Sequence, residues 1–197
     1  MQPMDGAAVL RAVGESDDVL GPAVDMDWTR QAAHVDWTVA KTVAHMAESL
    51  LWYATDMAAG PAELSSMDMT VPFDKSPAEL LRTLRTFAVV LARVLDAAEP
   101  EDRGWHPFGL PDASGFAGSA CDEIVIHTAD AAAGLGVDFA PSGDLAEAIL
   151  RRMFPWAPTD TDPWQTLLWA NGRVDLPGRE RQSGWRWHCA PLSEWDG

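Results

Sequence analysis

The sequence lacks the features that mark membrane-spanning and secreted proteins. None of its 197 residues belongs to an apolar run that approaches the roughly 20 residues needed to cross a bilayer. Residues 1–6 have neither the basic flank nor the apolar stretch of a signal peptide. We therefore expect a cytoplasmic protein with no membrane partner.

Basic residues and cysteines are also scarce. Fourteen Lys and Arg residues stand against 30 Asp and Glu residues, which gives a formal net charge of −16. Because phosphate binding needs a basic surface, nucleic acid is not an expected partner. The only two cysteines, Cys121 and Cys189, form no Cys-x-x-Cys motif, which argues against a disulfide framework and a zinc ribbon.

Helical periodicity is the main pattern that the sequence does contain. Apolar residues recur at helical spacing in four stretches of bundle length, at 6–20, 38–59, 77–98 and 113–135. Thr38 is an expected N-cap, and Ser76, Pro77 and Glu79 form the pattern of a capping box. Two shorter helices are expected at about 144–153 and 163–171, and alternation over 185–189 indicates an extended segment.

These elements predict an all-α protein, a four-helix bundle with short C-terminal helices and an irregular or partly extended tail. We expect a single domain over residues 1–197, with a core at about 5–140 and a C-terminal extension at 141–197.

The stretch 121–136 carries two stripes when it is read as a helix. One stripe is mostly apolar and includes Cys121, which we interpret as a core residue. The other stripe holds Glu123, His127 and Asp130 at positions i, i+4 and i+7. A carboxylate one turn before an imidazole can present two metal ligands, and it is equally common as an ordinary surface pair.

His45 lies off the apolar stripe of its own predicted helix, and taken alone it indicates a half-buried histidine more than a ligand. Its surroundings resemble a known pattern, because Trp37 precedes it by eight positions at the start of the second helix. Together with Glu123-x3-His127-x2-Asp130, this spacing resembles the signature of DinB-like proteins, and specifically of the N-terminal domain of mycothiol-dependent maleylpyruvate isomerase. The resemblance covers roughly residues 5–140.

The resemblance implies that His45, Glu123 and His127 bind one divalent metal. Two imidazoles and one carboxylate leave open metal positions, as in catalytic sites, whereas structural zinc sites are usually closed by four ligands. Zinc is the first choice, and nickel, iron and manganese also fit these ligand types. Asp130 is a candidate to orient the imidazole of a ligand histidine without itself binding the metal, although it could instead be solvated or pair with a buried arginine.

The resemblance also implies mycothiol or another small thiol as cosubstrate. A metal lowers the pKa of a bound thiol, so the expected function is a thiol-dependent transferase or isomerase that acts on a small electrophile. The alternatives are a non-catalytic bundle that binds a metal or small molecule, and a helical interaction module without metal. The oligomeric state and the substrate stay open.

The C-terminal extension departs from the family pattern. The isomerase carries a further C-terminal domain, and the residues after 140 are too few for one of comparable size, so we do not expect maleylpyruvate as the substrate. An arginine of the extension could contact an anionic substrate, although packing on the surface is the stronger expectation; the candidates are Arg179, Arg181 and Arg186. The other histidines, His34, His106 and His188, are not expected to bind metal.

Overall fold

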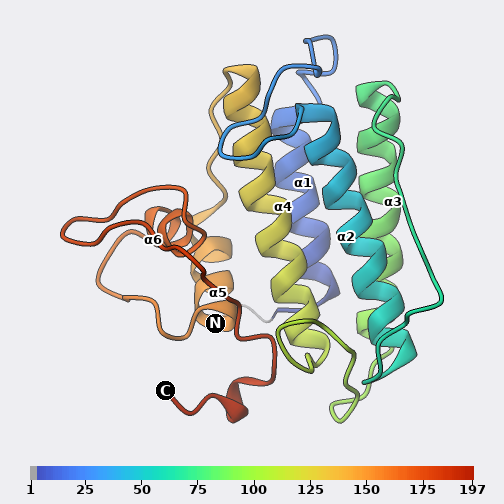
Figure 1. The fold of residues 1–197 in the computed structure, drawn as a ribbon, viewed down its shortest axis with the longest axis vertical. Helices are drawn as coiled ribbons and strands as arrows, with labels where there is room; N and C mark the ends of the chain where they lie inside the picture. Colours follow the sequence, from blue (N-terminus) through green and yellow to red (C-terminus); the bar gives the residue numbers. More distant parts are fainter. Residues whose placement is uncertain (1–3) are drawn as a thin grey trace.

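A computed structural model describes residues 4–197 and shows four long helices packed side by side (Figure 1). The bundle helices are α1 (Gly6–Leu20), α2 (Val39–Ala59), α3 (Pro77–Asp96) and α4 (Ala113–Leu135). Helices α1 and α2 each pack against both α3 and α4. The expected all-α bundle is confirmed, and the DinB-like fold is consistent with it.

Side-chain caps define the starts of the helices, and the sequence predicts those of α2 and α3. The Thr38 hydroxyl accepts a hydrogen bond from the backbone N–H of Lys41, and Ser76 and Glu79 form the expected capping box. Asp112 caps α4 by accepting the backbone N–H of Gly115 at 2.7 Å. Because these caps satisfy the first free N–H groups of each helix, the N-terminal boundaries are well defined.

Helix α4 is the central element of the molecule. Figure 1 shows it between the other bundle helices and the C-terminal extension, and its buried residues lie all around its axis. Two glycines allow this close packing. A Cβ at Gly118 would lie 2.3 Å from Sδ of Met153, and one at Gly115 would lie 2.3 Å from the carbonyl oxygen of Cys189.

The C-terminal extension forms a second layer against α4. It contains α5 (Gly143–Met153), α6 (Pro163–Ala170) and a short 3-10 helix at Leu192–Glu194. Helix α5 packs against both α4 and α6. The alternation at 185–189 produces no strand, since residues 4–197 contain only isolated β-bridges. This segment instead docks through side chains, of which Trp187 is buried.

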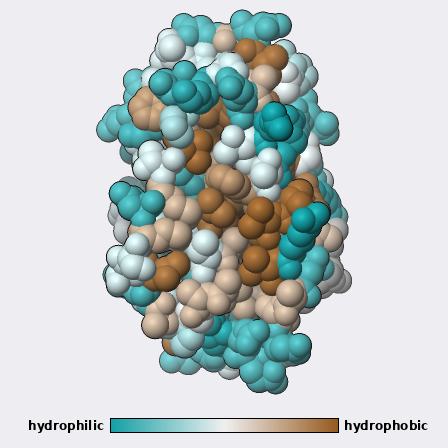
Figure 2. Space-filling model, turned by 90° about the vertical axis from the view of Figure 1, so that its right-hand side faces the viewer, coloured by the Kyte–Doolittle hydropathy of each residue, from teal (hydrophilic) through white to brown (hydrophobic). Residues whose placement is uncertain are grey.

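Apolar side chains also gather on one face of the molecular surface. Figure 2 shows the face on the α3 side, where apolar side chains gather in the middle and hydrophilic ones lie above and below. Exposed apolar residues of α3 and the preceding loop include Val89, Val90 and Phe73. None of the described helices combines the length and the apolar character that a bilayer crossing requires.

Candidate metal centre

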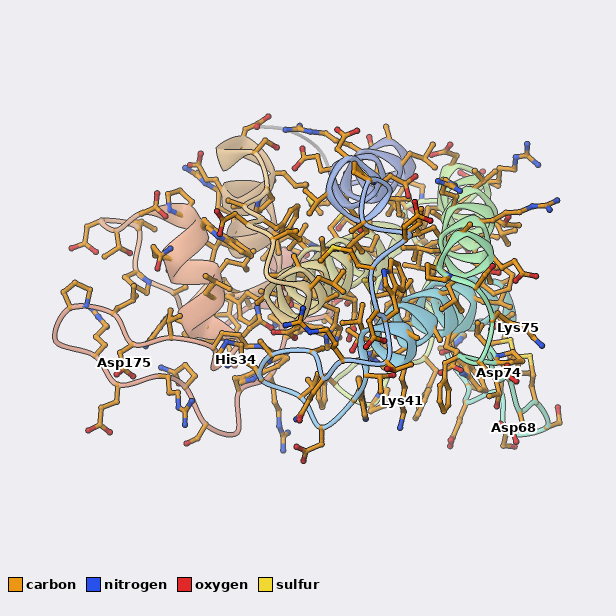
Figure 3. The ribbon with its side chains drawn as sticks, turned by 90° about the horizontal axis from the view of Figure 1, so that it is seen from above. His34, Lys41, Asp68, Asp74, Lys75 and Asp175 are labelled. Atoms are coloured by element: carbon orange, nitrogen blue, oxygen red, sulfur yellow. The ribbon has the colours of Figure 1, made fainter. Side chains whose placement is uncertain are left out.

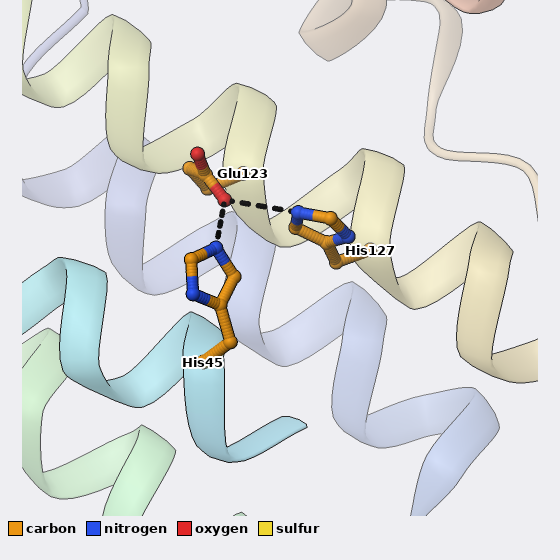
Figure 4. A group of neighbouring side chains, drawn as sticks. All are labelled: His45, Glu123 and His127. Atoms are coloured by element: carbon orange, nitrogen blue, oxygen red, sulfur yellow. Dashed lines mark ion pairs between the residues drawn. The ribbon is translucent and has the colours of Figure 1, made fainter. Parts of the chain in front are cut away.

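Two bundle helices bring the three predicted ligands together. His45 comes from α2, while Glu123 and His127 come from successive turns of α4 (Figure 4). The Oε2 atom of Glu123 lies 3.3 Å from Nε2 of His45 and 3.2 Å from Nε2 of His127. All three ligand atoms lie within 4.8 Å of one another, and residues 4–197 hold no second group of this kind.

The geometry around Glu123 fits a metal better than a pair of hydrogen bonds. Its Oε2 atom is buried and has no hydrogen-bond partner, although both imidazole nitrogens are close. Two ligand atoms of one tetrahedral zinc, each about 2.0–2.1 Å from it, lie about 3.3–3.4 Å apart. The 3.2 and 3.3 Å separations therefore match the spacing of two ligands of one ion. A buried carboxylate oxygen without a hydrogen bond is costly, so this donor set is compatible with a bound cation.

Electrostatics couple the three side chains. Burial alone would raise the pKa of Glu123, but the imidazoles of His127 and His45 hold that pKa well below its usual value. Burial alone would lower the pKa of His127, but Asp130 and Glu123 raise it to about 9. A metal that binds here must displace the proton of His127, as ligand histidines must be neutral.

Asp130 contacts both an imidazole and an arginine. Its carboxylate is buried and lies 3.1 Å from Nδ1 of His127, the nitrogen that does not face Glu123. It also accepts a 2.8 Å hydrogen bond from Nη2 of Arg173 in the C-terminal extension. Asp130 therefore holds the His127 ring and ties the extension to the candidate centre.

Trp37 packs against the two histidines from the loop before α2. Its ring centroid lies 4.7 Å from that of His45 and 5.9 Å from that of His127. The Lys41 ammonium lies 5.3 Å from the Trp37 ring centroid. Trp37 thus limits the rotation of both imidazoles and covers one side of the centre.

Residues of the C-terminal extension lie beside the candidate centre, although the sequence did not single them out. A small cavity of about 30 Å³ is lined by Glu123, His127, Arg173 and Trp187, among others. Asp122 anchors this wall, because it accepts hydrogen bonds from Nε1 of Trp187 at 2.7 Å and from Nδ2 of Asn171 at 3.0 Å. Burial raises the pKa of Asp122 to about 7.

The arginines considered from the sequence lie elsewhere. Arg179, Arg181 and Arg186 are exposed and do not line this cavity, whereas Arg173 does. The abundance of tryptophan and arginine in the extension was the one available signal, and it does not say which of these residues reach α4.

The remaining histidines do not join the cluster. His34 is exposed in a left-handed conformation, with φ of 58°. His106 lies beside the Cys189 thiol at 3.6 Å, and His188 contacts the carbonyl oxygen of Pro191 at 3.1 Å.

Comparison with known proteins bears on the same part of the chain. The family model described as mycothiol maleylpyruvate isomerase N-terminal domain matches residues 9–132. The match includes His45, Glu123, His127 and Asp130, and it ends before the C-terminal extension. Comparisons with curated proteins and with solved structures find no significant match. The chain belongs to the mycothiol maleylpyruvate isomerase N-terminal domain family.

Proposed function

We propose that His45, Glu123 and His127 hold one divalent metal, and that the protein is a mycothiol-dependent transferase or isomerase acting on a small electrophile. The metal is supported by the Oε2 atom of Glu123, which lies between two imidazole nitrogens and has no hydrogen-bond partner. Family membership supports mycothiol or another small thiol as the cosubstrate.

The donor set suits zinc, with nickel, iron and manganese as further options. When bound, such a metal supplies Lewis acidity that lowers the pKa of a coordinated thiol toward neutral pH. Residues of the chain would hold the ligand histidine in place. Asp130 can accept a hydrogen bond from Nδ1–H of His127, so that the neutral ring would present its Nε2 lone pair to a metal, and Trp37 packs beside the ring.

The protein itself offers no reactive thiol at neutral pH. Cys121 and Cys189 are both buried, and burial raises both pKa values, that of Cys189 to about 11. A thiolate nucleophile must therefore come from a ligand, which agrees with a thiol cosubstrate.

Metal analysis tests the first part of the proposal. Protein purified without a metal-affinity tag should contain about one divalent metal per chain by elemental analysis. The double variant His45→Ala, His127→Ala should lose it. The matched control is His34→Asn, which removes an exposed imidazole and keeps a residue that tolerates φ of 58°. Equal metal content in the double variant would refute the metal assignment.

Adduct formation tests the second part. In a mixture of mycothiol and a small electrophile, the metal-loaded wild-type protein should accelerate formation of the thioether. The double variant, supplied with the same metal, should not accelerate it to that extent. Metal binding without faster adduct formation would support the alternative, a metal-binding bundle that does not catalyse the reaction.

A further inference from the structure

The C-terminal extension contains a cavity of its own, with a volume of about 370 Å³. It is lined by α5, residues 154–163 and residues 192–195. Figure 3 shows α5 and α6 across α4 from α3, on the side that the extension covers. The cavity shares no lining residue with the hollow at Glu123 and His127, and all of its lining lies beyond the family match at 9–132. The family therefore assigns it no ligand.

The lining of this cavity is mainly apolar. Eight of its twelve lining residues are apolar, among them Leu150 and Phe154 at α5 and Leu192 and Trp195 in the tail at 185–197. Leu192 is 42% exposed and Trp195 is 37% exposed, although both side chains are large and apolar. A ligand that covers them removes apolar surface from water, which favours binding. The volume also falls within the range of small-molecule sites, roughly 300–1,000 Å³.

The loop side of the cavity is held in place by its backbone. The N–H of Ala157 donates to the carbonyl oxygen of Phe154 at 2.8 Å, which fixes a turn directly after α5. Pro155, Pro158 and Pro163 each have a fixed φ, so the loop has few conformations by which it could fill the space. This wall is therefore formed before a ligand binds.

The tail side is anchored by contacts outside the cavity. The Trp195 ring lies edge to face against the ring of His188, with centroids 5.1 Å apart. The backbone N–H of His188 donates to the carbonyl oxygen of Met153 at the end of α5, at 2.8 Å, and its Nε2 atom lies 3.1 Å from the carbonyl oxygen of Pro191. Because these contacts already fix Trp195 at the rim, a ligand does not have to order this wall.

Charge argues for an uncharged ligand. The cavity has two charged lining residues, Glu147 and Arg151, and they pair with each other through Nε and Nη2 of the arginine. An ionised ligand would lose hydration in this apolar space without gaining a free counter-charge. The remaining polar lining is Thr159 and Thr161, and the hydroxyl of Thr161 already lies 2.5 Å from that of Thr166. The lining thus suits a ligand with few polar groups.

We propose that this cavity is a second ligand site, which binds one uncharged, mainly apolar small molecule such as an aromatic ring system with one or two polar groups. The ligand contacts α5, the loop and the tail at once, so its binding holds the tail against α5. The inference goes beyond the metal-dependent function and does not depend on it, because the two sites have no lining residue in common.

A pair of fluorescent probes tests the inference. N-phenylnaphthylamine is uncharged, and anilinonaphthalene sulfonate has the same rings with one negative charge. We expect saturable one-to-one binding of the uncharged probe, and binding of the sulfonate that is weaker by about tenfold or more, because the cavity offers no free cation. Hydrogen exchange of residues 185–195 should become slower when the uncharged probe is bound, since the tail forms one wall.

Substitutions then locate the probe. Thr159→Trp adds a large side chain to the lining at an exposed loop position and should weaken the uncharged probe by about tenfold or more. The matched control is Ser183→Trp, at an exposed position of the chain outside this lining, which should bind like the wild type. Trp195→Ala removes an exposed part of one wall and should weaken binding by about tenfold even if Thr159→Trp misfolds.

Several outcomes would overturn the inference. These are the absence of saturable binding, tighter binding of the sulfonate than of the uncharged probe, and unchanged affinity in the folded Thr159→Trp and Trp195→Ala variants. Analytical ultracentrifugation tests another occupant: if the wild type is a dimer that Trp195→Ala dissociates, a second copy of the chain covers the cavity and the inference fails.

The metal-site variant separates the inference from the proposed function. His45→Ala, His127→Ala should bind the uncharged probe as tightly as the wild type, because neither histidine lines the cavity. If the wild type contains no metal and still binds the probe in this cavity, the proposed function fails and the inference survives. If the wild type contains the metal and does not bind the probe, the inference alone is overturned.

Discussion

Replacing Arg152 with methionine should detach the C-terminal extension from α4. The guanidinium is buried on α5 and donates to the Ser114 hydroxyl at 2.8 Å and the Asp112 carboxylate at 2.9 Å. It also donates to the carbonyl oxygens of His188 and Cys189, each at 2.9 Å. One side chain therefore joins the start of α4, helix α5 and the last segment of the chain.

The magnitude follows from what Arg152→Met leaves behind. Removing one partner of a buried ion pair costs about 3–5 kcal/mol, but Asp112 is 23% exposed and keeps hydrogen bonds from Ser114 and Gly115. The two carbonyl oxygens each lose a charged donor in a region of low exposure. Because methionine preserves the apolar stem, we expect the free energy of unfolding to fall by about 3 kcal/mol.

Urea unfolding at pH 7 measures this loss, and hydrogen exchange should show faster opening of residues 185–191. The control is Arg151→Met on the same helix, which loses only an exposed ion pair with Glu147 and should change stability by no more than about 0.5 kcal/mol.

Acid provides a further check. Burial alone would raise the pKa of Asp112, but Arg152 and the other partners of the carboxylate hold that pKa below its usual value. The stabilisation that the ionised Asp112 provides is therefore present above the pKa of the unfolded chain and is lost as the pH falls through the pKa of the folded protein. The difference between wild type and Arg152→Met should therefore shrink in strong acid. If both arginine variants have the same stability at pH 7, the reasoning is wrong.

Three further predictions concern metal, pH and packing. Asp130→Asn should weaken metal binding about 10- to 100-fold in chelator competition, because it removes the carboxylate that orients His127. Burial lowers the pKa of His106 to about 4, so below pH 6.5 the unfolded chain binds a proton that the folded protein does not bind. Between pH 7 and pH 5 the free energy of unfolding, measured in urea, should therefore fall by up to about 2 kcal/mol more in the wild type than in His106→Gln. Gly115→Ala should lower the unfolding free energy by about 1–3 kcal/mol through its clash with a backbone oxygen, whereas Gly14→Ala, with open space around it, should raise it by about 0.5–1 kcal/mol.

Each of these has a contrary outcome. Unchanged metal affinity in Asp130→Asn would mean that the carboxylate serves only Arg173. Parallel pH profiles of wild type and His106→Gln would show that the imidazole titrates normally in the fold. Equal stabilities of the two glycine variants would show that the extension does not approach α4 as closely as the structure has it.

The bundle was predictable because its signals are local. A cap such as Ser76 with Glu79, or a stop such as Gly60, acts within one helical turn, and the apolar stripes of α2 and α3 report burial directly. The segment at 185–189 was harder to place, for the opposite reason. Its alternation resembles a strand, but no neighbouring strand pairs with it, and its buried side chains dock on α4 individually.

The candidate site was predictable only in part. Glu123 and His127 share a helix, so their proximity follows from spacing, whereas the approach of His45 depended on the family resemblance. Arg173 and Trp187 were not predictable, since each is one of several similar residues in the extension. Which of them reaches α4 depends on contacts across more than 40 positions in the chain.

Three carboxylates of α4 connect the C-terminal extension with the candidate metal centre. Asp122, Glu123 and Asp130 are all withdrawn from solvent on a helix that has neither lysine nor arginine, and His127 lies between Glu123 and Asp130 as the one imidazole of that helix. The extension supplies Trp187 and Asn171 to Asp122, and Arg173 to Asp130. It supplies nothing to Oε2 of Glu123, although Arg173 lines the same small cavity. The carboxylates of Asp122 and Asp130 thus receive hydrogen bonds from the extension, whereas Oε2 of Glu123 faces only the imidazoles of His45 and His127, and this is the position at which we propose a metal.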